Sequence, residues 1–185
     1  MQPGGKQPAP GALAVVQAFI NTRIDDWDVD EIATLEGLGS WLRAQGLLDD
    51  DEAVDVGDVA RAADLREGLR QLCLSNGGHE TDAGLLNAFD RAAERVTMRL
   101  RITEDATPRL AATGSGVDRA LGEILARVAL AEAECTWIRL KACPTPTCRW
   151  AFYDHTRNRS ARWCAMSICG QRTKAQAYRR RHAPG

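Results

Sequence analysis

The sequence predicts a mainly α-helical N-terminal domain with one β-hairpin (α+β), followed by a small cysteine-rich module. Three observations carry this prediction: apolar residues recur at helical spacing over most of residues 11–134, one stretch changes to two-residue alternation, and four of the six cysteines lie beyond residue 140. A chain of 185 residues has room for one ordinary domain and a small one. We therefore expect a flexible tail over residues 1–10, a helical domain over 11–134 and a basic module over 135–185.

Helical periodicity and capping residues define the expected helices. Thr34 is a candidate N-cap, Thr81 or Asp82 opens a later helix, and the Asn76-Gly77-Gly78 sequence stops the helix before it. The acidic stretch 25–31 reads as a loop. The helices are expected over residues 12–21, 34–46, 58–75, 81–93 and 117–134.

The periodicity changes in one place. Val96, Met98, Leu100 and Ile102 alternate with polar residues, which predicts a half-buried strand. Residues 104–108 form the expected turn, and residues 109–112 return as the second strand of the hairpin.

The net charge of −1 conceals a strong asymmetry. Residues 135–185 contain 11 Lys and Arg but a single acid, Asp154, for a net charge of +10, whereas the rest of the chain sums to −11. Such a division is typical of a polyanion-binding tail on a separate body. A solvated face and an electrostatic dock on the acidic body are the alternatives.

Four cysteines form two matched pairs, Cys143 with Cys148 and Cys164 with Cys169, separated by 15 residues. Pairs at this spacing are typical of a zinc site, and four thiolates leave no position for a reactive water, so we expect one structural Zn²⁺. Cys73 and Cys135 read as core residues, and His155 and His182 are not needed as ligands. The sequence shows no export signal and no membrane span, so we expect a cytoplasmic protein with reduced thiols.

Around the cysteines, residues 149–153 suit a strand and 154–158 a turn, residues 160–163 return toward the second pair to complete a hairpin, and 170–181 can form a helix. A knuckle, a hairpin and a helix that begins at the last ligand make a treble-clef-like zinc finger.

This stretch resembles the CGNR zinc finger family. The helical domain, through Phe19-Ile-Asn-Thr22 and residues 35–48 with Trp41, is similar to the ABATE domain that normally precedes that finger. The resemblance implies a bacterial transcriptional regulator whose finger binds DNA, with the four cysteines as ligands and Arg172 as the motif arginine; Gln171 takes the place of the family Asn. The finger segments that carry the resemblance are Arg139-Leu-Lys-Ala-Cys143, Cys148-Arg-Trp-Ala-Phe-Tyr-Asp154, Arg157-Asn-Arg-Ser160, Arg162-Trp-Cys-Ala-Met166 and Cys169-Gly-Gln-Arg172.

DNA is the expected partner, bound through phosphate contacts from basic residues of the finger. RNA is an alternative, with Trp150, Phe152, Tyr153 and Trp163 as stacking faces. A third interpretation is a protein-interaction module whose finger docks on an acidic surface. The candidate DNA contacts are Arg157, Arg159, Arg162, Arg172, Lys174, Arg179, Arg180 and Arg181.

We find no catalytic pattern, so an enzyme is not expected. A small-molecule effector site in the helical domain is a further hypothesis, although helix capping and packing explain the same residues. A homodimer is left open. The residues of that hypothetical pocket are Asn21, Thr22, Trp27 and Trp41.

Overall fold

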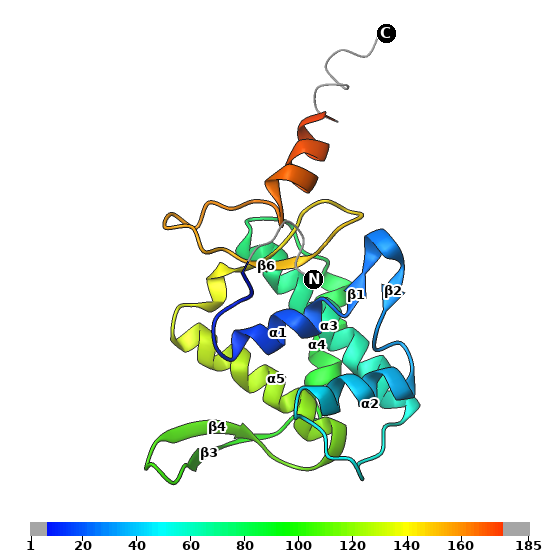
Figure 1. Cartoon of the computed structure of the whole chain (residues 1–185). Coiled ribbons are helices and arrows are strands. Elements are labelled where there is room, and N and C mark those ends of the chain that lie inside the picture. Colours follow the sequence, from blue (N-terminus) through cyan, green and yellow to red (C-terminus); the bar gives the residue numbers. More distant parts are fainter. Residues whose placement is uncertain (1–6, 176–185) are drawn as a thin grey trace.

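The computed structural model describes residues 7–175, and it confirms a mainly helical protein with short antiparallel strand pairs (Figure 1). The three strand pairs of the described residues are β1 (Arg23–Ile24) with β2 (Val29–Asp30), β3 (Met98–Ile102) with β4 (Pro108–Ala112), and β5 (Leu140–Ala142) with β6 (Ala151–Tyr153). The α-helices are α1 (Leu13–Ile20), α2 (Leu35–Ala44), α3 (Val56–Asn76), α4 (Ala83–Ala93) and α5 (Gly116–Ala133). The short helical turns are η2 (Asp25–Trp27), η3 (Trp137–Arg139) and η4 (Met166–Gly170).

Side-chain caps fix where the helices begin. The Thr34 hydroxyl accepts a hydrogen bond from the Gly37 amide (3.0 Å), which confirms the predicted cap of α2. Asp55 and Asp58 form a reciprocal capping box, so α3 begins two residues earlier than expected. The Asp82 carboxylate accepts hydrogen bonds from the first amides of α4.

The core forms where α1, α3 and α5 meet. Val16 and Phe19 of α1 and Leu121 of α5 are fully buried there, as the helical periodicity predicts. α4 packs along α3 at close range because Gly68 has no side chain: a Cβ at this position would lie 2.7 Å from Cδ2 of Phe89. None of the helices within residues 7–175 combines the length and the apolar composition that crossing a membrane requires.

The β3–β4 hairpin confirms the predicted strands, but the expectation that it is half-buried is wrong. Only its base packs on α5, where Ala112 approaches Gly122. The rest projects away from the body (Figure 1), and Leu100 and Ile102 are 68% and 67% exposed. The alternation of apolar and polar residues correctly gives the hairpin two different faces. Beyond its base, however, no element of the described chain covers the apolar face.

Two further segments differ from the expectation. Residues 1–6 of the predicted flexible tail lie outside the described residues, but Ala9 is buried and its amide donates to Oε1 of Gln17 (2.6 Å), so the tail does not extend to residue 10. The acidic stretch 25–31 is a small hairpin, β1–η2–β2, in place of an irregular loop, and the Glu31 amide donates to the Thr22 carbonyl (2.9 Å) at its base.

Candidate metal centre and nucleic-acid interface

The four cysteines predicted as ligands come together. Their Sγ atoms all lie within 4.8 Å of one another, and all four residues are buried. Sγ of Cys164 lies 3.5 Å from Sγ of Cys148 and 3.7 Å from Sγ of Cys169. Around a tetrahedral zinc ion with Zn–S bonds of about 2.3 Å, neighbouring sulfurs are about 3.8 Å apart. The cluster therefore has the size and the donor set of a four-thiolate zinc site.

The close contacts between the thiols favour ionisation of Cys143 and oppose ionisation of Cys148 and Cys164, because their hydrogen bonds lower the pKa of Cys143 and raise the pKa of the other two. The hydrogen bond between Cys148 and Cys143 raises the pKa of Cys148 to about 12, and burial acts in the same direction. A divalent cation reverses this effect because it stabilises neighbouring thiolates. A bound cation would therefore favour the thiolate form of Cys148 and Cys164, and the spacing of the four sulfurs fits such an ion.

The first cysteine pair forms a knuckle between β5 and β6. The Cys143 amide donates to the Trp150 carbonyl (2.9 Å) and the Cys148 amide to the Thr145 carbonyl (2.9 Å). Arg149 then turns the chain into β6 with a positive φ of 49°.

The sequence correctly predicts the strand that follows the knuckle but not its partner. β6 pairs with β5, upstream of the first ligand, and residues 160–163 are not a strand. The reason is Asp154, whose carboxylate accepts hydrogen bonds from the amides of Thr156 (3.0 Å) and Ala161 (2.9 Å) and folds the intervening loop around itself.

The second pair opens a helical segment, as predicted. Cys169 lies in η4, a π-helical turn, and residues 171–175 continue as helix. The Thr173 hydroxyl donates to the Cys169 carbonyl (2.9 Å). The remainder of the predicted helix, residues 176–181, lies outside the described residues.

The other candidate ligands lie outside the cluster. Cys73 is fully buried in the core, as predicted, and burial raises the pKa of its thiol. Cys135 was also expected in the core, but it is exposed: α5 has already ended, and Cys135 turns the chain with a φ of 55°. His155 lies beside the carbonyl groups of Gln7 and Pro8. His182 lies outside the described residues.

The finger shares its core with the helical domain. Leu140 and Ala151 of the β5–β6 pair belong to the main hydrophobic core. Asn21 of the helical domain pairs with the backbone of β6: its Nδ2 donates to the Ala151 carbonyl (2.9 Å) and its Oδ1 accepts from the Ala151 amide (2.8 Å). Gln17 donates to the same carbonyl (3.1 Å). Two buried side-chain amides four residues apart, Gln17 of α1 and Asn21 at its C-cap, were a signal for this contact that the sequence-based prediction missed.

A buried arginine of α3 holds the first knuckle. Arg70 is fully buried and donates to the carbonyl groups of Ile20 (2.7 Å) and Arg149 (2.8 Å). Burial lowers its pKa, and the Glu67 carboxylate 3.1 Å away opposes that shift. In the sequence, Glu67 and Arg70 resemble an ordinary solvated pair, so this role was not predicted.

Two basic residues of the finger, Lys141 and Arg139, make contacts within the finger itself. Lys141 pairs with Asp154 (2.9 Å), the only acid of residues 135–185. Arg139 donates to the carbonyl groups of Asp154 (3.0 Å) and Thr156 (2.9 Å). Burial would raise the pKa of Asp154, but the hydrogen bonds from Thr156 and Lys141 outweigh it and lower that pKa to about 2.

The predicted DNA-contacting residues within the described chain are all exposed: Arg157, Arg159, Arg162, Arg172 and Lys174. They occupy the loop before Cys164 and the helical segment after Cys169, and that helical segment points away from the body (Figure 1). Arg162 stacks on Trp163 at 5.5 Å from the ring centroid. Arg172 bridges to Asp26 of the β1–β2 hairpin (3.3 Å) and to Thr147 of the first knuckle (3.1 Å). Arg179, Arg180 and Arg181 lie outside the described residues.

The four residues of the hypothetical effector pocket have separate positions. Asn21 binds β6, Thr22 donates to the Phe19 carbonyl (2.8 Å), and the Trp41 ring packs on Phe19 with centroids 5.4 Å apart. Trp27 is 74% exposed on the β1–β2 turn. Asn21, Thr22 and Trp41 therefore have packing roles, and the four residues do not line one buried site.

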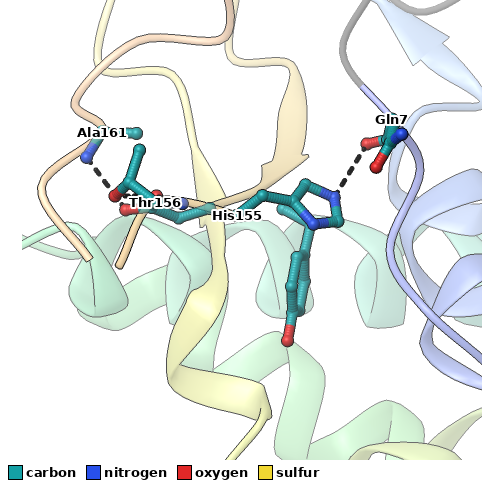
Figure 2. Close-up of a pocket in the computed structure, with 6 residues that line it drawn as sticks. Gln7, His155, Thr156 and Ala161 are labelled. Atoms are coloured by element: carbon teal, nitrogen blue, oxygen red, sulfur yellow. Dashed lines mark hydrogen bonds between the residues drawn. The ribbon is translucent and has the colours of Figure 1, made fainter. Parts of the chain in front are cut away.

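A cavity lies instead beside the junction of the finger with the N-terminal segment (Figure 2). It measures about 350 Å³ and is lined by Gln7, Tyr153, Asp154, His155, Thr156 and Ala161. Figure 2 shows the His155 ring hydrogen-bonded to Gln7, and the Asp154 carboxylate is already held by Thr156 and Ala161. The charged group of this cavity is therefore occupied in packing the finger loop.

Comparison with known families agrees with this arrangement. The CGNR zinc finger model matches residues 139–182, which contain all four clustered cysteines. The ABATE model, described as "Putative stress-induced transcription regulator", matches residues 13–135, more than half of the chain. A search of curated proteins finds no match. The chain therefore belongs to the ABATE family and carries a C-terminal CGNR zinc finger.

Proposed function

We propose that this protein is a zinc-containing, DNA-binding transcription regulator that contacts DNA through the exposed basic residues of its finger. The observation that carries the proposal is how the finger distributes its charges. Arg139 and Lys141 are consumed by internal contacts, and the single acid, Asp154, is buried in one of them. The basic residues around the second cysteine pair are left on the surface, where they favour a polyanion.

One structural Zn²⁺ held by the four cysteines would stabilise this surface. A module of about 50 residues has little core of its own, and zinc bound by four thiolates contributes on the order of 10–16 kcal/mol to folding such small units. The site would carry a formal charge of −2, which offsets only part of the finger's net charge of +10.

The aromatic residues of the finger favour DNA over RNA as the proposed partner. Base stacking requires exposed aromatic faces. Trp150, Phe152 and Tyr153 are buried, and Trp163 is half-buried with Arg162 over its ring. The protein-docking alternative keeps one specific observation in its favour, the ion pair of Arg172 with Asp26. That pair engages one arginine and leaves Arg157, Arg159 and Arg162 exposed.

The test is the salt dependence of duplex DNA binding by the zinc-loaded full chain, measured by fluorescence anisotropy. Each neutralised phosphate adds about −0.9 to the slope of log K against log salt, so five finger contacts predict a contribution of roughly −4 to −5. The variant R157Q/R159Q/R162Q should flatten the slope by about 2.7. Arg91→Gln, at an exposed position of α4, is the matched control and should leave the slope unchanged. A finger variant that binds like the wild type, or stronger binding to RNA or to an acidic polypeptide than to DNA, would refute the proposal.

A further inference from the structure

The projecting β3–β4 hairpin, with its flanking residues 95–113, is amphipathic; we refer to it as the arm. Its register places Leu100 opposite Leu110 and Arg101 opposite Arg109. Because side chains alternate along a strand, Arg99, Arg101 and Arg109 share one face and the apolar residues share the other.

The arginine face points away from the body. At the base of the arm, Ala112 lies against Gly122 of α5, and Ala112 belongs to the apolar face. The opposite face, with its three exposed arginines, is therefore the one that a large partner can approach. The arm and the finger lie at opposite ends of the molecule (Figure 1).

The charges of the arm contrast with those of its surroundings. Residues 95–113 carry a net charge of +2, whereas the rest of residues 1–134 sums to −13. Arg95 at the base pairs with Asp118 (3.0 Å), but within residues 7–175 none of Arg99, Arg101 and Arg109 has a carboxylate oxygen within 4.0 Å. Arg101 and Arg109 face each other directly across the strands, where like charges destabilise a hairpin. An anionic partner on this face would remove that repulsion.

We propose that the arginine face of the arm is a second nucleic-acid contact, which binds the phosphate backbone of duplex DNA. The proposal rests on the proposed function for its choice of partner, but its residues are separate from those of the finger. Arg99 and Arg101 lie about 6.8 Å apart along their strand. A duplex carries one charge per about 1.7 Å of its axis, so it offers phosphates to both arginines in many positions, whereas an acidic protein would need carboxylates at a matching spacing. A two-stranded ribbon also has dimensions that a duplex groove admits.

The experiment uses the zinc-loaded full chain and a mixed-sequence duplex of about 40 base pairs, roughly 136 Å long at ~3.4 Å per pair, so that one duplex can span the molecule. Anisotropy titrations from 50 to 200 mM KCl compare the wild type with R99Q/R101Q/R109Q. Loss of three phosphate contacts should flatten the slope by about 2.7, so over this fourfold salt range the wild type loses about 40-fold more affinity than the variant. Thermal unfolding and zinc content establish that the variant is folded.

Two controls locate the effect. R99K/R101K/R109K keeps the charge and should keep the slope, whereas L100T/I102T changes only the exposed apolar face and should leave the slope unchanged. An arm variant with the wild-type slope overturns the proposal, and so does an acidic polypeptide that competes for the arginine face while the DNA slope stays the same.

The finger variant R157Q/R159Q/R162Q separates the two proposals. A wild-type salt slope in the finger variant, together with a flattened salt slope in the arm variant, would support DNA binding by the arm and refute DNA binding by the finger. The reverse result would refute the arm alone. No DNA binding by the wild type at 50 mM KCl would refute both.

Discussion

Replacing Asn21 with alanine tests whether the finger and the helical domain fold as one unit. The Asn21 side chain makes two buried hydrogen bonds to Ala151, one to its amide and one to its carbonyl. Gln17 remains as a donor to the carbonyl, but the amide would have no partner. A buried N–H without an acceptor costs about 1–3 kcal/mol, and the lost bond to the carbonyl about 1 kcal/mol more. We expect Asn21→Ala to lower the free energy of unfolding by about 2–4 kcal/mol.

Urea unfolding of the zinc-loaded chain, followed by tryptophan fluorescence and far-UV circular dichroism, measures this loss. For a chain of this size the same change lowers Tm by roughly 2–4 °C per kcal/mol. Asn87→Ala makes the same replacement at an exposed position of α4 and should change stability by less than about 0.5 kcal/mol. An Asn21 variant as stable as this control would contradict the prediction, and so would a wild-type finger that unfolds in a transition of its own and leaves the helical domain intact.

Three further predictions concern the finger and the core. Asp154→Asn should cost about 2–3 kcal/mol at pH 7; because the folded pKa of Asp154 is lowered to about 2, that cost should vanish in urea titrations as the pH falls from about 4 to about 2. Cys148→Ser should abolish zinc retention and shift the fluorescence of the buried Trp150 to the red, whereas Cys135→Ser, at the exposed cysteine, should retain one zinc per chain by elemental analysis. Gly68→Ala should destabilise the chain by about 1–3 kcal/mol in thermal unfolding because the new Cβ meets both the Cβ and the ring of Phe89, and the cost should be smaller in a Phe89→Gly background, which removes both.

Features with local causes were predictable from the sequence. The start of α2 follows from Thr34, whose hydroxyl reaches an amide three residues away, and the metal ligands follow from the spacing within two short cysteine pairs. Both depend on residues close together in the chain, so tertiary context does not override them.

Features that depend on distant partners were not predictable. Alternation divides residues 96–102 into two faces, but it cannot tell that no other described element covers the apolar face. β6 pairs with β5 because β5 is already anchored in the core, and the loop around Asp154 prevents the expected pairing with residues 160–163. Asn21 binds a residue 130 positions further along the chain, and nothing in the local sequence names that partner.

Selection from a random duplex library measures directly whether the basic residues of the finger bind DNA. The zinc-loaded full chain and its R157Q/R159Q/R162Q variant are each incubated with the library, and the retained duplexes are counted and sequenced. We expect the wild type to retain and enrich duplexes, and the finger variant, with its zinc content unchanged, to retain far fewer. Equal retention by the two proteins, or no retention by either, would contradict this expectation.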